Sequence, residues 1–250
     1  MARYQLTLAY DGTDFFGSQR QANKRTVQGE LEKALCQLGW TERSVLMSGR
    51  TDTGVHATGQ VASFDLPWSH SDDELVRALN AVLPADMAVS QTRMVHATFH
   101  PRFDAISRRY RYRLFCQPVR DPIRERFAWR IWPPISGDVL PETAKLFLGT
   151  HDFSAFGSPT TPRGGTVRTV MKAEWSRSRE VEDEWHFEVR ANAFLYRMVR
   201  RLVFVQVVVA QGKVSAEAIT TSFVKSEASE KLPAGLAPPH GLTLVEVAYA

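Results

Sequence analysis

Residues 49–57 read GRTDTGVHA and separate two short apolar segments, 45–48 and 60–66, that are typical of β-strands. Glycine permits backbone conformations closed to other residues, and loops at strand ends often carry function. Asp52 is expected to stay ionised near neutral pH, because the nearby Arg50 favours the charged form. An ionised carboxylate suits nucleophilic or basic chemistry. Taken alone, however, Asp52 is also compatible with a simple turn cap beside a solvated Arg50.

The triplet Asp-Thr-Gly at residues 52–54 also matches the aspartic protease motif. Protease chemistry needs two such loops, whose carboxylates share one proton. No second Asp-Thr-Gly or Asp-Ser-Gly occurs in the sequence. The loop therefore predicts some other carboxylate chemistry.

Outward from this loop, the hydrophobic pattern predicts an alternation of strands and helices. Residues 193–210 fit either class, since their early apolar spacing suits a helix and the β-branched run 203–209 suits a strand; their length favours a helix. Ser71 and Glu74 form a capping box that starts another helix. Further helices are expected at 26–38, 141–148 and 215–223, and strands at 3–10, 45–48, 60–66, 87–95, 107–115, 167–176, 184–191 and 241–249.

This order predicts an α+β fold in two halves, each with a largely antiparallel sheet packed by helices. We place the boundary between residues 105 and 106, which gives an N-terminal domain at 1–105 and a C-terminal domain at 106–250. The first would carry the Asp52 loop. The second would carry the strand at 107–115 and the basic segment that follows residue 192.

Composition narrows the class of protein. The 250 residues are 44% hydrophobic, which is typical of a folded globular protein. No secretory signal or membrane-spanning run is visible, so we expect a cytoplasmic protein. Cys36 and Cys116 share no metal-ligand or disulfide spacing, and the seven histidines are scattered. We therefore expect no metal site.

The net charge is only +4, but the basic residues are 24 Arg against 7 Lys. Arginine binds phosphate in a bidentate manner and stacks on bases. On a strand, Arg109, Arg111 and Arg113 would point one way and Arg108, Tyr110 and Tyr112 the other. A helix at 193–210 would also gather Arg197, Arg200 and Arg201. These clusters predict an anionic polymer as partner, although solvated arginines on an exposed strand fit the same pattern.

At this point the sequence resembles the TruA pseudouridine synthases, whose signature runs Gly-Arg-Thr-Asp-x-Gly-Val-His. The similarity covers nearly the whole chain, including residues 10–13 with Gln19, 26–28, 31–35, 99–100, 102–103, Ala105, 109–112, 151–153, 194–195, 198–200, 237–238 and 241–242. Departures from the family pattern are few. They are Ser18, Pro101 and Phe204, which stand where the family usually has Trp, Ala and Gly, and a changed segment around residues 208–211.

The resemblance implies a pseudouridine synthase-like fold with ferredoxin-like halves and a cofactor-free isomerase that acts on tRNA. It further implies conversion of uridines 38, 39 and 40 in the anticodon arm, and a homodimer that binds one tRNA across both subunits. Asp52 would be the essential carboxylate. Tyr110 would stack on the target base, Arg50 would hold the everted nucleotide and Arg200 would pair with Asp52. We expect Arg108, Arg109 and Arg111 to contact RNA.

The sequence leaves two alternative functions open. One is a non-catalytic RNA-binding or tRNA-folding protein on the same scaffold. The other is a related synthase that acts on different uridines or a different RNA. The intact Asp52, Arg50 and Tyr110 favour the isomerase over the first alternative.

Overall fold

The computed structural model describes residues 1–161, 164–181, 183–224 and 232–250, and the chain divides into two units. The first unit comprises Met1–Ile106 with Thr243–Ala250, and the second comprises Ser107–Leu242. The predicted C-terminal domain ran to residue 250, whereas Thr243–Ala250 belongs to the first unit. The reason is that this segment pairs with a strand of the first unit, where Thr243 lies opposite His56 and Leu244 opposite Ala57.

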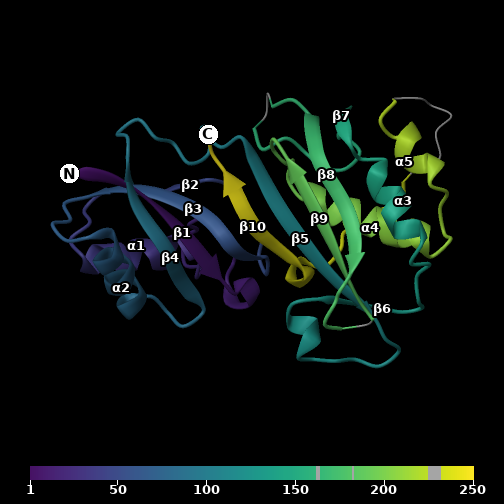
Figure 1. The fold of residues 1–250 in the computed structure, drawn as a ribbon, viewed down its shortest axis with the longest axis horizontal. Helices are drawn as coiled ribbons and strands as arrows, with labels where there is room; N and C mark the ends of the chain where they lie inside the picture. Colours follow the sequence, from purple (N-terminus) through teal and green to yellow (C-terminus); the bar gives the residue numbers. More distant parts are fainter. Residues whose placement is uncertain (162–163, 182, 225–231) are drawn as a thin grey trace. The chain divides into compact units, whose positions relative to one another are not determined.

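In the first unit, four strands lie in the order β4-β1-β3-β10, and β2 adds to β3. The antiparallel pairs are β1 with β3, β1 with β4 and β2 with β3, and β10 runs parallel to β3. The two helices α1 and α2 lie side by side in this unit (Figure 1). The elements are β1 (Ala2–Tyr10), η1 (Gly12–Asp14), α1 (Val27–Gln37), β2 (Leu46–Met47), β3 (His56–Leu66), α2 (Asp72–Val82), β4 (Met87–Val95) and β10 (Leu242–Ala248).

Alternation along β1 builds the core of the first unit. Every second side chain from Tyr4 to Tyr10 is buried. Because successive strand residues point to opposite faces, these side chains share one face of the sheet. The predicted capping box at the start of α2 is confirmed: Ser71 accepts a hydrogen bond from the Glu74 N–H, and the Glu74 carboxylate accepts one from the Ser71 N–H.

In the second unit, the strands lie in the order β5-β9-β8-β7 and are antiparallel, and β6 runs parallel to β5. Helices α3, α4 and α5 gather on the side of β8 (Figure 1). The elements are β5 (Ser107–Cys116), η2 (Arg124–Arg126), β6 (Trp129–Ile131), α3 (Val139–Lys145), β7 (Gly149–Asp152), β8 (Val167–Arg177), β9 (Glu184–Ala191), α4 (Met198–Ala210), α5 (Glu217–Thr221) and η3 (Pro239–Gly241). The predicted α+β class is confirmed.

Helix α4 is the buried centre of the second unit. Its β-branched run is almost wholly inaccessible to solvent, so burial of apolar area outweighs the modest helix propensity of valine. The single polar residue inside, Gln206, accepts a hydrogen bond from Trp175 Nε1 at 2.8 Å and donates to the Leu202 carbonyl at 3.1 Å. The helix begins at Met198 rather than at residue 193, because Arg197 adopts a left-handed conformation with φ 62°.

Candidate active site

The Asp52 loop connects β2 to β3 in the first unit and places two of the predicted site residues at the surface. Arg50 is exposed and Asp52 is half-buried. The Val55 N–H donates to the Asp52 carbonyl at 3.1 Å and closes a turn that contains Gly54 at φ 78°. This left-handed conformation explains the second glycine of the segment, because a side chain there would be strained. The turn leaves the Asp52 carboxylate on a tightly held main chain.

Thr51, immediately before Asp52, is buried and fixed on three sides. Its N–H donates to Ser18 Oγ at 2.8 Å, and its carbonyl accepts from the Ser18 N–H at 3.1 Å. Its hydroxyl hydrogen-bonds the hydroxyl of Tyr10 at 2.8 Å. The position of Asp52 is thereby tied to β1 and to the segment that precedes α1. Ser18, one of the departures from the family pattern, thus lies directly under the loop.

The start of the loop is held by Gln60, a fully buried residue of β3. Ser48 Oγ donates to Gln60 Oε1 at 2.6 Å, and Gln60 Nε2 donates to the Gly49 carbonyl at 3.1 Å. Burial raises the pKa of Tyr10 to about 12, although hydrogen bonds with Thr51 and Gln60 act in the opposite direction. The Tyr10 hydroxyl therefore stays protonated and available as a donor at physiological pH.

Two glycines outside the loop permit the close approach of neighbouring segments. Gly17 has φ 83°, and a Cβ there would lie 2.9 Å from the Thr51 carbonyl oxygen. A Cβ on Gly12 would lie 2.0 Å from the Val55 carbonyl oxygen. Any side chain at either position would push the Asp52 loop away from its support.

The sequence-based predictions do not include a role for Tyr10, Ser18 and Gln60 in supporting the loop. The one sequence signal that could have indicated such a role is the polar residue Gln60 at the start of the apolar run 60–66.

The remaining predicted residues lie in the second unit. Tyr110 is on β5, and the edge of its ring meets the Phe194 ring at a centroid distance of 5.1 Å and an angle of 86°. Arg108, also on β5, donates to the Asn192 carbonyl at 3.0 Å. The neighbouring Tyr112 is fully buried and its hydroxyl donates to the Pro238 carbonyl at 2.8 Å. Tyr110 is thus positioned by an aromatic neighbour from the segment before α4.

Arg109 and Arg111 converge on one carboxylate, that of Glu188 on β9. The nitrogen–oxygen distances to Glu188 are 3.3 Å from Arg109 and 2.7 Å from Arg111, and Lys172 on β8 lies 3.1 Å from the same carboxylate. Burial alone would raise the pKa of Glu188, but the hydrogen bonds and positive charge of Arg111 and Lys172 lower it overall. This ion cluster orders the two arginines on the face of the sheet opposite the buried Tyr112.

Arg200, in the first turn of α4, is bound to the segment that precedes η3. Its Nε donates to the Ala237 carbonyl at 2.8 Å, and the Ala237 N–H donates to the Arg200 carbonyl at 3.1 Å. Arg201 donates to the carbonyls of Pro233 and Gly235. The predicted grouping of Arg197 with these two residues is altered, because Arg197 lies before the helix and its guanidinium lies over the Tyr196 ring.

The structure therefore places Asp52 and Arg50 together in the first unit. It places Tyr110, Arg200 and the three RNA-binding candidates, Arg108, Arg109 and Arg111, in the second. Across the described ranges, no group of three or more His, Cys, Asp or Glu residues is arranged to hold a metal ion.

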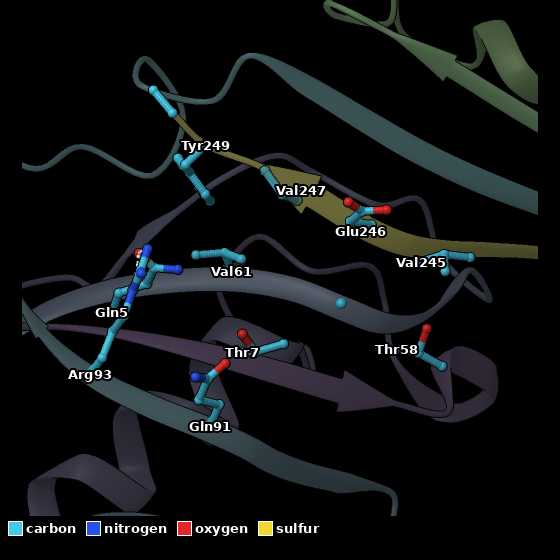
Figure 2. Close-up of a pocket in the computed structure, with 12 residues that line it drawn as sticks. Gln5, Thr7, Thr58, Val61, Gln91, Arg93, Val245, Glu246, Val247 and Tyr249 are labelled. Carbon is cyan, nitrogen blue, oxygen red and sulfur yellow. Dashed lines mark hydrogen bonds between the residues drawn. The ribbon is translucent and has the colours of Figure 1, made fainter. Parts of the chain in front are cut away.

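A separate pocket of about 390 Å³ lies in the first unit (Figure 2). It is lined by residues of β1, β3, β4 and β10 and by Tyr249 and Ala250, which follow β10, and by none of the predicted site residues. In it, Arg93 donates to Gln5 Oε1 at 2.9 Å. Val61, Val245 and Val247 contribute apolar lining. The pocket is thus distinct from the Asp52 loop.

Comparison with known proteins shows the family to which the chain belongs. The family model described as tRNA pseudouridine synthase matches residues 7–104 and 143–250. The matched ranges include the Asp52 loop and α4, and they cover most of the chain. The chain belongs to the tRNA pseudouridine synthase family, a family of isomerases.

Individual relatives are similar to this chain over nearly their whole length. A protein of Geobacillus sp. (strain WCH70) named tRNA pseudouridine synthase A is 42% identical over 99% of this chain and 98% of its own length. The proteins of that name from Methylacidiphilum infernorum and Bacillus subtilis are 41% and 38% identical, over 98% and 99% of this chain and 95% and 99% of theirs. In the part of the chain that the structure describes, no helix is both long and apolar enough to cross a membrane.

Proposed function

We propose that this protein isomerises uridine to pseudouridine at positions 38, 39 and 40 in the anticodon stem-loop of tRNA, with Asp52 as the catalytic carboxylate. The reaction breaks the N1–C1′ bond, turns the uracil and joins C5 to C1′. The proton lost from C5 is balanced by one gained at N1, so the reaction is redox-neutral and internal to one nucleotide. No cofactor is required.

The observation that carries this proposal is the way Asp52 is held. A half-buried carboxylate stands next to an exposed arginine, and its main chain is fixed through Thr51 to Ser18 and Tyr10. Rigid support lets a reacting group keep its geometry while the flexible substrate adapts. Three routes suit such a carboxylate: attack at C1′, addition to C6 of the uracil, or removal of the C2′ proton.

The other residues receive roles by the same proposal. A target base must leave the stack to be reached. Tyr110 would stack on this base, Arg50 would hold the everted nucleotide, and Arg200 would pair with Asp52. Arg108, Arg109 and Arg111 would contact RNA phosphates. The active form would be a cytoplasmic homodimer with a tRNA across both subunits.

Incubation of the purified protein with unmodified tRNA, without any added cofactor, tests the proposal. Pseudouridine should appear at positions 38 to 40, and mapping of total RNA should show no other targets. The variant Asp52→Asn should form none while it still binds tRNA at low salt. Asp73→Asn, which removes one exposed carboxylate from the same unit, is the matched control and should remain active.

Each failure has a distinct meaning. Full activity in Asp52→Asn would refute the catalytic assignment. Absence of pseudouridine with the parent protein, together with tight tRNA binding, would support the non-catalytic RNA-binding alternative. Modification at other positions would support a synthase of different specificity.

A further inference from the structure

Residues 16–25 form a closed loop between η1 and α1. The Phe16 N–H donates to the Arg25 carbonyl at 2.9 Å, and Gln21 Nε2 donates to the Phe16 carbonyl at 2.6 Å. Asn23 turns the chain at φ 57°, a conformation that asparagine tolerates better than most residues. The main chain of Phe16 is therefore fixed through both its N–H and its carbonyl.

The ring of Phe16 points outward, in contrast to its neighbour. Phe15 is 1% exposed and packs against Tyr10 at a ring-centroid distance of 6.2 Å. Phe16 is 46% exposed, so its ring contributes much less to the core. An aromatic side chain held rigidly at the surface loses little conformational entropy when it binds a partner.

A cation accompanies this ring. Lys24 Nζ lies 4.4 Å from the centre of the Phe16 ring, within the range of a cation–π interaction. Lys24 is itself exposed, as is Arg20 earlier in the loop. The surface thus combines an aromatic face with positive charge, which is the combination that binds single-stranded nucleic acid through base stacking and phosphate contacts.

The same loop is joined directly to the Asp52 loop. Gly17 follows Phe16 and lies against the Thr51 carbonyl, and Ser18 forms its two hydrogen bonds with Thr51. Phe16 is therefore only two residues before Ser18, and Ser18 contacts Thr51, the residue that precedes Asp52. An RNA whose target uridine reached Asp52 would bring its adjoining nucleotides to this surface.

We propose that Phe16 and Lys24 form a stacking surface for an unpaired base of the tRNA substrate that adjoins the target uridine. Phe16 stacks on the base, and Lys24 contributes its charge to the flanking phosphate. This inference rests on the proposed function, because it assumes that RNA enters at Asp52. It adds residues to which neither the signature loop nor the arginine clusters drew attention.

The test measures tRNA binding in the Asp52→Asn background, so that affinity is observed without turnover. Phe16→Ala should weaken binding by about 5- to 150-fold, the range expected for the loss of one base–aromatic stack. Phe16→Tyr should bind like the parent, and Phe16→Leu should lie between, because it keeps apolar area without the aromatic face. Met94→Ala, which trims another exposed apolar side chain of the first unit, should leave affinity unchanged.

Lys24 is tested by the dependence of affinity on salt. Lys24→Ala should reduce the slope of log affinity against log salt by about 0.7, the value for one phosphate contact on a single strand. Lys33→Ala, which removes a lysine paired with Glu30 on α1, should leave the slope unchanged. Parent-like affinity in a folded Phe16→Ala variant would overturn the inference and leave the assignment of Asp52 intact. Full activity of Asp52→Asn would instead overturn the proposed function, whatever Phe16 does.

Discussion

Ser18 and Thr51 bind each other twice: the Ser18 hydroxyl accepts the Thr51 N–H at 2.8 Å, and the Ser18 N–H donates to the Thr51 carbonyl at 3.1 Å. Ser18 is 1% exposed, so water does not readily reach the Thr51 N–H to take the place of the Ser18 hydroxyl as acceptor. The Ser18 carbonyl also accepts from the Gln28 N–H in α1 at 2.9 Å. The first turn of α1 and the Asp52 loop are thus connected through one small side chain and its main chain.

We expect Ser18→Ala to leave the Thr51 N–H buried without an acceptor, at a cost of about 1–3 kcal/mol in the free energy of unfolding. The loop should also become less ordered, so kcat should fall more than the affinity for tRNA. Chemical denaturation and steady-state kinetics measure the two effects. Ser90→Ala, at an exposed serine of β4, is the control. Unchanged stability and kcat in Ser18→Ala would show that the Asp52 loop keeps its structure without the Ser18 hydroxyl.

Gly17 and Gly39 offer a matched pair for the close approach of the Asp52 loop. Both have left-handed φ values, 83° and 89°, but only at Gly17 would an added Cβ have other atoms within 4 Å. Gly39→Ala should cost about 1–2 kcal/mol for the conformation alone. Gly17→Ala should cost more and should lower activity, because its methyl group displaces Thr51. Equal melting temperatures for the two variants would contradict this expectation.

Tyr10 predicts a pH dependence of stability. Its pKa is raised from 10.0 to about 12 in the folded protein. A raised folded-state pKa means that its contribution is complete below pH 10 and is lost as the pH rises towards 12. Unfolding free energies of the parent and of Tyr10→Phe, measured from pH 8 to about pH 12, should therefore converge at the alkaline end. A constant difference over this window would show that Tyr10 does not titrate as described.

Glu188 pairs with Arg109 and Arg111, so its carboxylate would compete with any RNA phosphate that these two arginines contact. The variant Glu188→Gln removes the negative charge and should tighten tRNA binding if these arginines contact RNA. The salt dependence should steepen by up to about 0.9 in slope for each phosphate that the released arginines newly neutralise. Glu174→Gln, at an exposed carboxylate of β8 that pairs with Lys172, serves as the control. Identical salt slopes in the parent and Glu188→Gln would argue against RNA contacts by Arg109 and Arg111.

Local signals in the sequence predicted most of the elements. The capping box of α2 depends on residues three positions apart, and the alternation of β1 is visible in one short segment. The start of β3 was not predicted, because Thr58 and Gly59 have the composition of a turn. Gly59 is there because β10 approaches: a Cβ on it would lie 2.1 Å from the Val245 carbonyl oxygen. No local pattern contains that information.

The candidate site shows the same difference between features that depend on local sequence and features that depend on the tertiary fold. Asp52 and Arg50 stand in one contiguous segment, so their shared location could be predicted. The support by Tyr10 and Ser18 joins residues 41 and 33 positions apart along the chain, and it depends on how β1 and the loop fold together. The ion cluster at Glu188 depends on the register of β5 against β9, in which Arg111 lies opposite Glu188. Pairing register is a tertiary property.

Strand β10 has a consequence for the synthesis of this protein. The first unit needs Thr243–Ala250 to cover the edge of β3 next to His56, directly after the Asp52 loop. During translation the second unit emerges completely before that strand does, so the unit that starts first is finished last. Until then, an open strand edge is available for incorrect pairing. A fragment that ends at residue 106 would keep the open edge of β3 permanently. A protein that lacks β10 should therefore aggregate rather than merely lose activity.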